Sequence, residues 1–170
     1  MRELKIPFRV IPSRLLEPPP GLLDPISYTR RLALAKARLI AEKAAEGWVL
    51  GADTVVVHKG QILGKPADFS EACRMLSRLQ GTSHRVITAV ALVNARTSRS
   101  IVRHETSTVT MRPLSLQEIG RIAGKHLDKA GAYAVQDKRD PLIRQVKGSF
   151  TNVVGFPMEV VTKLLKTSGF

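Results

Sequence analysis

The hydrophobic positions of the chain follow two spacings, one typical of helices and one typical of strands. Between Pro25 and Gly47, apolar side chains recur every three to four residues, which predicts a helix over residues 26–46 that follows the proline and stops at the glycine. β-Branched and apolar residues then predict two strands, 48–57 and 61–63, which a polar Lys-Gly turn joins into a hairpin.

Strands and helices continue to alternate through the rest of the chain. Residues 124–140 are rich in glycine and charge and are expected to form a loop and a short helix. The other predicted elements are a helix over 69–80, strands over 84–94 and 100–111, a short helix after the capping-box pair Ser115 and Glu118, a strand over 142–148 and a last helix over 158–165. This irregular alternation predicts a single α/β domain of residues 1–170, with a mixed, partly antiparallel sheet flanked by helices.

A carboxylate, Asp53, interrupts the most apolar predicted strand. Removing an ionised carboxylate from water is costly unless it meets a cation, a metal ion or several N–H donors. Because side chains alternate along a strand, Asp53 shares a face with Val55, and Gly51 would leave that face bare beside it, with room for a ligand. Asp53 is therefore either part of a site or a strand-end aspartate that bonds a neighbouring loop.

Two lysines and a glutamate are candidates for the charges around Asp53. Lys65 lies in a Gly-Lys-Pro turn that holds it in place, which suits a phosphate chain or the aspartate itself. Lys36 lies beside the apolar stripe of the first predicted helix, and Glu17 precedes three prolines that fix its direction. The alternatives are a solvated turn lysine, a lysine that extends along the stripe to water, and a glutamate that faces solvent.

Two later segments are candidates for direct substrate contact. Gln136 follows Gly-Ala-Tyr-Ala, which permits close approach, and its amide offers both the donor and the acceptor needed to read a pyrimidine edge. Residues 147–157 contain Gly148, Ser149 and Asn152. They are expected either to supply backbone donors or to form a tight hairpin before the last helix.

Composition narrows the choice of partners. The chain has 27 Lys and Arg against 14 Asp and Glu, a net charge of +13, which favours nucleic acid or a phosphorylated small molecule unless it is only a basic surface. Aromatic residues make up 5%, which argues against a base-stacking platform for nucleic acid. The single cysteine, Cys73, fits a reducing cytoplasm, and the longest apolar run, 86–93, is too short to span a membrane.

The candidate residues together suit one kind of chemistry. Carboxylates hold a hard divalent cation and lysines neutralise phosphate oxygens, so the set suits metal-assisted attack of water on a phosphoanhydride. The sequence contains no zinc motif, nucleophile elbow, Walker A or GxGxxG pattern that would point elsewhere.

The sequence resembles the Maf family of nucleoside triphosphate pyrophosphatases over nearly the whole chain. Five segments carry the resemblance, in the family's order and spacing: RLALAKA (31–37), VLGADTVVVHKGQILGKPAD (49–68), ML..L.GTSHRVITAVAL (75–92), LDKAGAYAVQ (127–136) and GSFTNVVGFP (148–157). The resemblance implies hydrolysis of a nucleoside triphosphate to the monophosphate and pyrophosphate with a divalent metal cation, Mg²⁺ or Mn²⁺. It also implies a mixed-sheet fold with a deep cleft, related to that of inosine triphosphate pyrophosphatases, and often a homodimer.

In terms of that family, six residues receive a role. Asp53 matches the catalytic acid/base that activates water and contacts the metal ion. The other implied roles are phosphate contacts by Lys36 and Lys65, a metal-binding carboxylate of the early loop at Glu17, and substrate choice at Thr54 and Gln136. The pairing of Thr54 with Gln136 is similar to the subgroup that acts on dTTP and UTP, not to the one that acts on 7-methyl-GTP.

The start of the chain departs from the family pattern. Family members usually begin with a strand and a Ser-x-Ser-Pro-Arg-Arg loop that leads into a first helix, whereas residues 2–13 resemble the end of that helix and the segment after it. The chain is therefore expected to be N-terminally truncated relative to the family and to lack one wall of its site. Two alternatives stay open: a nucleotide-binding or regulatory protein with impaired catalysis on the same fold, and a basic nucleic-acid-binding protein.

Overall fold

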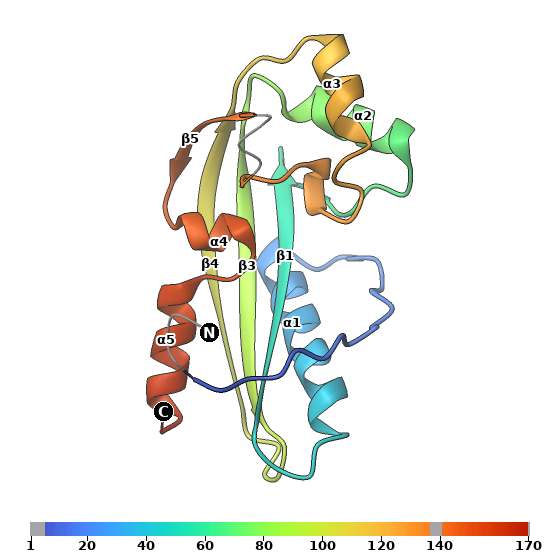
Figure 1. Ribbon diagram of the computed structural model, residues 1–170. Helices are drawn as coiled ribbons and strands as arrows, with labels where there is room; N and C mark the ends of the chain where they lie inside the picture. The colour runs from blue at the N-terminus through green and yellow to red at the C-terminus, as the bar shows by residue number, and fades with distance from the viewer. Residues whose placement is uncertain (1–5, 137–140, 170) are drawn as a thin grey trace.

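A computed structural model describes residues 6–136 and 141–169 (Figure 1). These described residues form one five-stranded sheet in the order β2-β1-β3-β4-β5, with helices packed against it. In chain order the elements are α1 (Pro25–Ala41), β1 (Trp48–His58), β2 (Gln61–Leu63), α2 (Phe69–Leu79), β3 (Ser83–Asn94), β4 (Ser100–Met111), α3 (Leu116–Ala123), the 3₁₀-helix η2 (Ala130–Ala132), β5 (Ile143–Lys147), α4 (Phe150–Val154) and α5 (Met158–Thr167). The predicted α/β class, with helices flanking a sheet, is confirmed.

The four strand pairings in the described part of the chain are all antiparallel, which corrects the expected mixed sheet. Hairpins join β1 to β2 and β3 to β4, and a hairpin can only produce antiparallel neighbours. The connection through α2 returns the chain to the other edge of β1, where β3 again runs antiparallel to it. The strand periodicity predicted the strands but carried no information on how the longer connections return.

The sequence pattern predicted the hairpin, α2, β3, β4, α3 with its capping box, β5 and α5 to within about two residues. Helix α1, however, ends at Ala41 instead of residue 46, because residues 42–47 offer no large apolar side chain to the core. Residues 150–154 form α4 instead of the tight hairpin, since Ser149 Oγ accepts the Asn152 N–H at 3.2 Å and so caps a helical turn. Within the predicted loop 124–140, residues 137–140 lie outside the described residues.

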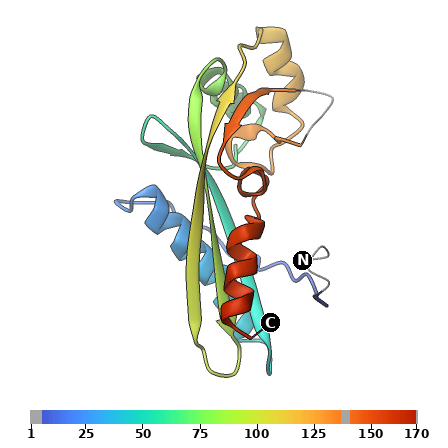
Figure 2. The same cartoon turned by 90° about the vertical axis from the view of Figure 1, so that its left-hand side faces the viewer.

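Helices occupy both faces of the sheet (Figure 2). Because side chains alternate along β3, Ala89 and Ala91 pack against α1, whereas Val90 and Leu92 pack against α5. Helices α2 and α3 and the η2 turn cover the α5 face of the sheet at its other end, around Val86. Among the described residues, no helix combines the length and apolar character that crossing a membrane requires.

Strand β2 is short, and this leaves part of β1 open. It pairs only with residues 56–58 of β1, whereas β3 pairs with residues 48–57. Within the described chain, residues 48–55 of β1 therefore have a neighbouring strand on one side only. This unpaired edge lies beside Asp53.

Gly51 allows α1 to approach the sheet closely. A Cβ atom at this position would lie 2.6 Å from the Ala33 carbonyl oxygen and 2.8 Å from the Ala37 backbone nitrogen. The space above Gly51 is thus filled by α1, so the expectation that it leaves room for a ligand is wrong. A bare position on a strand can admit another backbone as readily as a ligand.

Substitution Gly51→Ala is expected to destabilise the protein by about 2 kcal/mol, since the added methyl group meets the rigid backbone of α1. Urea unfolding of the variant measures this loss. Gly120→Ala is the matched control: Gly120 lies inside α3 with open space around it, so the same change should raise stability by about 0.5–1 kcal/mol. Equal effects of the two substitutions would contradict the close approach of α1.

Candidate active site

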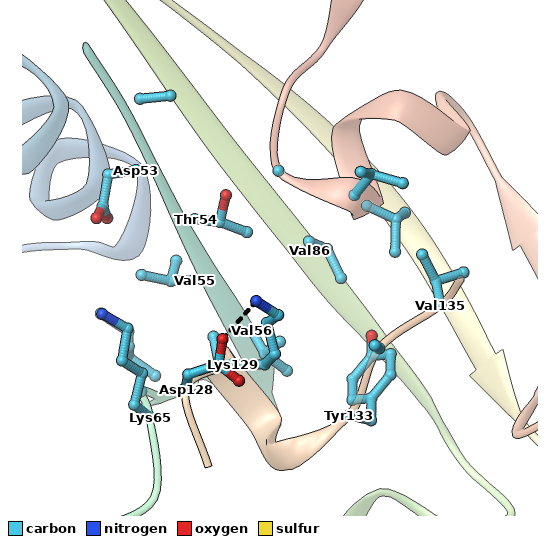
Figure 3. Close-up of a pocket in the computed structure, with 18 of the residues that line it drawn as sticks. Asp53, Thr54, Val55, Val56, Lys65, Val86, Asp128, Lys129, Tyr133 and Val135 are labelled. Atoms are coloured by element: carbon cyan, nitrogen blue, oxygen red, sulfur yellow. Dashed lines mark hydrogen bonds and ion pairs between the residues drawn. The ribbon is translucent and has the colours of Figure 1, made fainter. Parts of the chain in front are cut away.

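A cavity of about 410 Å³, called here the edge cavity, lies against the unpaired edge of β1 (Figure 3). Asp53 and Val55 line it from the face of the sheet that α1 covers, and Thr54 and Val56 line it from the opposite face. The cavity therefore wraps around the strand, which is possible only because β2 does not continue along it. The six residues to which the family resemblance gives a role all line this one cavity: Glu17, Lys36, Asp53, Thr54, Lys65 and Gln136.

Lys36 pairs with both carboxylates of the edge cavity. Its Nζ donates hydrogen bonds to Asp53 Oδ1 at 2.6 Å and to Glu17 Oε1 at 2.8 Å. Lys65 Nζ lies 3.7 Å from the same Glu17 oxygen, and Figure 3 shows its ammonium group turned toward Asp53. The charge in the apolar strand is thus compensated by a cation from α1, because the Lys36 side chain turns into the site instead of extending to water.

The loop before α1 is held in place so that Glu17 reaches Lys36. The Tyr28 hydroxyl donates a hydrogen bond to the Pro18 carbonyl oxygen at 2.9 Å, one residue after Glu17. Asp24 caps α1 by accepting the N–H groups of Ile26 and Ser27, which fixes where the helix begins. The helical spacing over residues 26–46 includes Tyr28 among its apolar positions but does not predict the use of its hydroxyl.

Burial and the ion pairs act in opposite directions on the charged groups. Burial raises the pKa of Asp53 above its ordinary value, and the hydrogen bond and charge of Lys36 only partly offset this. Burial also works against charge on Glu17 and Lys36, but the bonds and charges of their partners outweigh it. Lys36 and Lys65 lower the pKa of Glu17, and Asp53 and Glu17 raise the pKa of Lys36. Asp53 is 7% exposed. It is therefore the carboxylate of the site whose proton affinity the fold increases.

The opposite wall of the edge cavity contains a neutral pair that sequence reasoning missed. Tyr133 lines the cavity, and its hydroxyl lies 2.7 Å from His84 Nε2 of β3. Burial, helped by the nearby charge of His58, lowers the pKa of His84 to about 4, and burial raises the pKa of Tyr133. Both groups are uncharged at neutral pH, so their hydrogen bond holds the segment that leads to Gln136 without placing a charge on this wall.

The acidic side of the edge cavity has an acceptor with no partner among the described residues. Asp53 Oδ2 is buried and makes no hydrogen bond to them, while Oδ1 accepts a hydrogen bond from Lys36. In the described part of the chain, no three acidic, histidine or cysteine side chains gather closely enough to hold a metal ion by themselves. The two carboxylates fit a cation such as Mg²⁺, which usually takes one or two carboxylates and completes its coordination with water and substrate phosphates.

The fold and this site define a class: an α/β protein with a charged cleft at the open edge of an antiparallel sheet. The family model described as "Maf-like protein" matches residues 1–168, and the chain belongs to the Maf family.

Curated relatives match along most of their length. A dTTP/UTP pyrophosphatase of Pelotomaculum thermopropionicum is 41% identical over 100% of this chain and 90% of the relative. The dTTP/UTP pyrophosphatases of Elusimicrobium minutum and Symbiobacterium thermophilum are 42% and 41% identical, over 96% and 100% of this chain and 88% of each relative.

Substitution Lys36→Met should cost about 3 kcal/mol of stability at neutral pH, because it leaves the buried carboxylate of Asp53 without its cation. An acid whose pKa is raised in the folded state destabilises the fold when ionised and ceases to do so when protonated. The deficit of the variant should therefore shrink as the pH falls and Asp53 takes up a proton. Urea unfolding of both proteins from neutral to acidic pH measures it.

Lys43→Met is the matched control, since Lys43 follows α1 and is exposed. It should change stability by no more than about 0.5 kcal/mol at any pH. A deficit of Lys36→Met that is equally large in acid and at neutral pH would contradict the ion pair with Asp53.

Proposed function

We propose that this protein hydrolyses nucleoside triphosphates, with dTTP and UTP as substrates, to the monophosphate and pyrophosphate. The observation that carries the proposal is the contact of Lys36 with Asp53 and Glu17 on the wall of a cavity of about 410 Å³, a size typical of small-molecule sites. Relatives about 40% identical over almost the whole chain are named dTTP/UTP pyrophosphatases, which supports this substrate class.

Asp53 serves as the general base in the proposed reaction. It accepts a proton from a water molecule whose oxygen attacks the α-phosphorus, and the bond from that phosphorus to the oxygen bridging the β-phosphate breaks. The free acceptor Oδ2 is available for this water, while the bond of Oδ1 to Lys36 holds the carboxylate in place. The raised pKa of Asp53 makes it a better proton acceptor than an ordinary aspartate.

The two lysines stabilise the charge that builds up on the phosphate oxygens. An ammonium group has three N–H donors, and Lys36 uses two of them on Asp53 and Glu17, which leaves one for a phosphate oxygen. Lys65 lies beside Glu17 and is more exposed than Lys36. It is suited to the β- and γ-phosphates, whose release as pyrophosphate requires a contact that can be broken easily.

The residues that would hold a divalent cation are Asp53 and Glu17, with the substrate phosphates as further ligands. When bound, the cation supplies Lewis-acid polarisation of the phosphate oxygens and charge neutralisation. Each carboxylate has about four lone-pair sites, so a bond to Lys36 leaves both carboxylates with acceptor capacity.

The far wall of the edge cavity would read the base. Thr54 lines the cavity from the face of the sheet opposite Asp53, Gln136 also lines it, and the Gln136 amide offers a donor and an acceptor to a pyrimidine edge. The homodimer and the cytoplasmic location expected from the sequence stay predictions.

Asp53→Asn should lower the rate of pyrophosphate release from dTTP and UTP by about a hundredfold or more, because the amide cannot take up the proton of water. A coupled pyrophosphate assay with Mg²⁺ measures this. The matched control is Asp68→Asn, the N-cap of α2, where asparagine caps a helix as well as aspartate does. No release by the unmodified protein would favour the alternative of a nucleotide-binding protein with impaired catalysis, and equal release by Asp53→Asn would overturn the role of Asp53.

Removal of divalent cations by a chelator should abolish pyrophosphate release, and added Mg²⁺ or Mn²⁺ should restore it. Circular dichroism before and after chelation checks that the fold does not change. Full activity in excess chelator would contradict the proposed role of Asp53 and Glu17 as cation ligands.

A further inference from the structure

Helix α4 docks onto the sheet through one buried amide. Asn152 is fully buried, and its Nδ2 donates hydrogen bonds to the Val86 carbonyl oxygen at 3.0 Å and to Ser107 Oγ at 2.9 Å. Its Oδ1 accepts the Thr88 N–H at 3.1 Å. The side chain of Asn152 thus uses both its donors and its acceptor on the two strands β3 and β4.

The orientation of this amide is fixed by the direction of the neighbouring hydrogen bond. The Ser107 hydroxyl donates to the Ser149 carbonyl oxygen at 3.0 Å, which uses its only proton. Ser107 can therefore only accept from Asn152, so the nitrogen of the amide must face Ser107 and its oxygen must face Thr88. Helix α4 is locked against β3 with no freedom to reverse the amide.

The hydrogen bonds of Asn152 continue to Thr88 and from there to Thr54, which lie directly opposite each other on β3 and β1. The Thr88 hydroxyl lies 2.8 Å from the Asn152 carbonyl oxygen, and since a carbonyl cannot donate, Thr88 must be the donor. The Thr54 and Thr88 hydroxyls lie 2.9 Å apart. Because the single proton of Thr88 is used, Thr54 donates to Thr88 and has only lone pairs left for the edge cavity.

We propose that Thr88 is a positioning residue that makes Thr54 a hydrogen-bond acceptor toward the substrate, and that this selects bases presenting an N–H donor. The proposal deepens the proposed function and rests on it. The base edge of uracil or thymine has one donor, N3–H, between two carbonyl oxygens, whereas the N3 of cytosine is an acceptor. A Thr54 hydroxyl that can only accept a hydrogen bond can bind the N3–H group of uracil or thymine. Its lone pairs would repel the lone pair on N3 of cytosine.

Two features of the described structure support a fixed Thr54. Its neighbour at the end of α4 is Gly155, where a Cβ atom would lie 3.2 Å from Thr54 Oγ1 and the φ angle of +100° disfavours other residues. Thr88 itself is fully buried, so solvent does not compete for its hydroxyl. The hydrogen bonds that link Asn152 to Thr88 are therefore shielded from solvent, and only Thr54 faces the cavity.

Thr88→Val tests the proposal, since it keeps the shape and the backbone N–H bonded by Asn152 but removes the hydroxyl. Thr54 can then turn its proton toward the substrate and act as a donor to cytosine. The ratio of kcat/KM for UTP to that for CTP should fall by about tenfold, which corresponds to the free-energy contribution of one hydrogen bond. Thr88→Ser keeps the hydroxyl and should restore the ratio of the unmodified protein.

A purely structural role for Thr88 would reduce kcat/KM for UTP and CTP equally in Thr88→Val and leave the ratio unchanged, and this would overturn the proposal. Calorimetric titration of all three proteins with UMP and CMP gives a second reading that needs no turnover. Loss of the uracil preference in Thr88→Val, but not in the other two proteins, supports the proposal, whether or not a triphosphate is hydrolysed. A complete absence of hydrolysis would count against the proposed function instead. Equal affinity of the unmodified protein for UMP and CMP would overturn the inference.

Discussion

The buried pair of Lys36 and Asp53 is the interaction on which the rest of the site depends. An aspartate that is 7% exposed in a β-strand requires a cation, and the cation comes from a helix that must lie close enough to reach it. Gly51 permits that approach because the strand has no side chain under the backbone of α1. The strand glycine, the position of the helix and the ion pair are thus one constraint, and a change in any of them alters the other two.

The short β2 strand explains why one cavity can contact both faces of the sheet. Where β2 stops, the edge of β1 is open, so neighbouring residues on opposite faces of the sheet line the same space. In the proposed function the α1 face, with Asp53 and Lys36, handles phosphate and water, and the α4 face, with Thr54, reads the base. Two adjacent residues of one strand would then connect the chemistry and the choice of substrate in this member of the Maf family.

Much of the fold could be predicted from the sequence because it is encoded locally. The apolar and β-branched runs predicted the strands, the Lys-Gly turn predicted the end of β1, and the capping box predicted the start of α3. Asp53 stood out because a charge in an apolar strand needs an explanation, and the same reasoning, applied to the histidine near the start of β3, would have drawn attention to His84.

The rest depends on contacts between segments far apart in the chain. The purpose of Gly51 is visible only once α1 lies over it, and the bond of Tyr28 to Pro18 needs the folded loop. The bonds of Asn152 to β3 likewise join residues more than sixty positions apart. Sequence periodicity specifies which face a side chain occupies but not which partner it meets there, so these contacts could not be predicted.

The most direct test of the account is a carbon-13 NMR titration of the Asp53 carboxyl group in the folded protein. Because burial outweighs the pairing with Lys36, the midpoint should lie above that of an ordinary aspartate and should rise further in Lys36→Met. A midpoint at or below the ordinary value, or one that does not respond to the loss of Lys36, would contradict it.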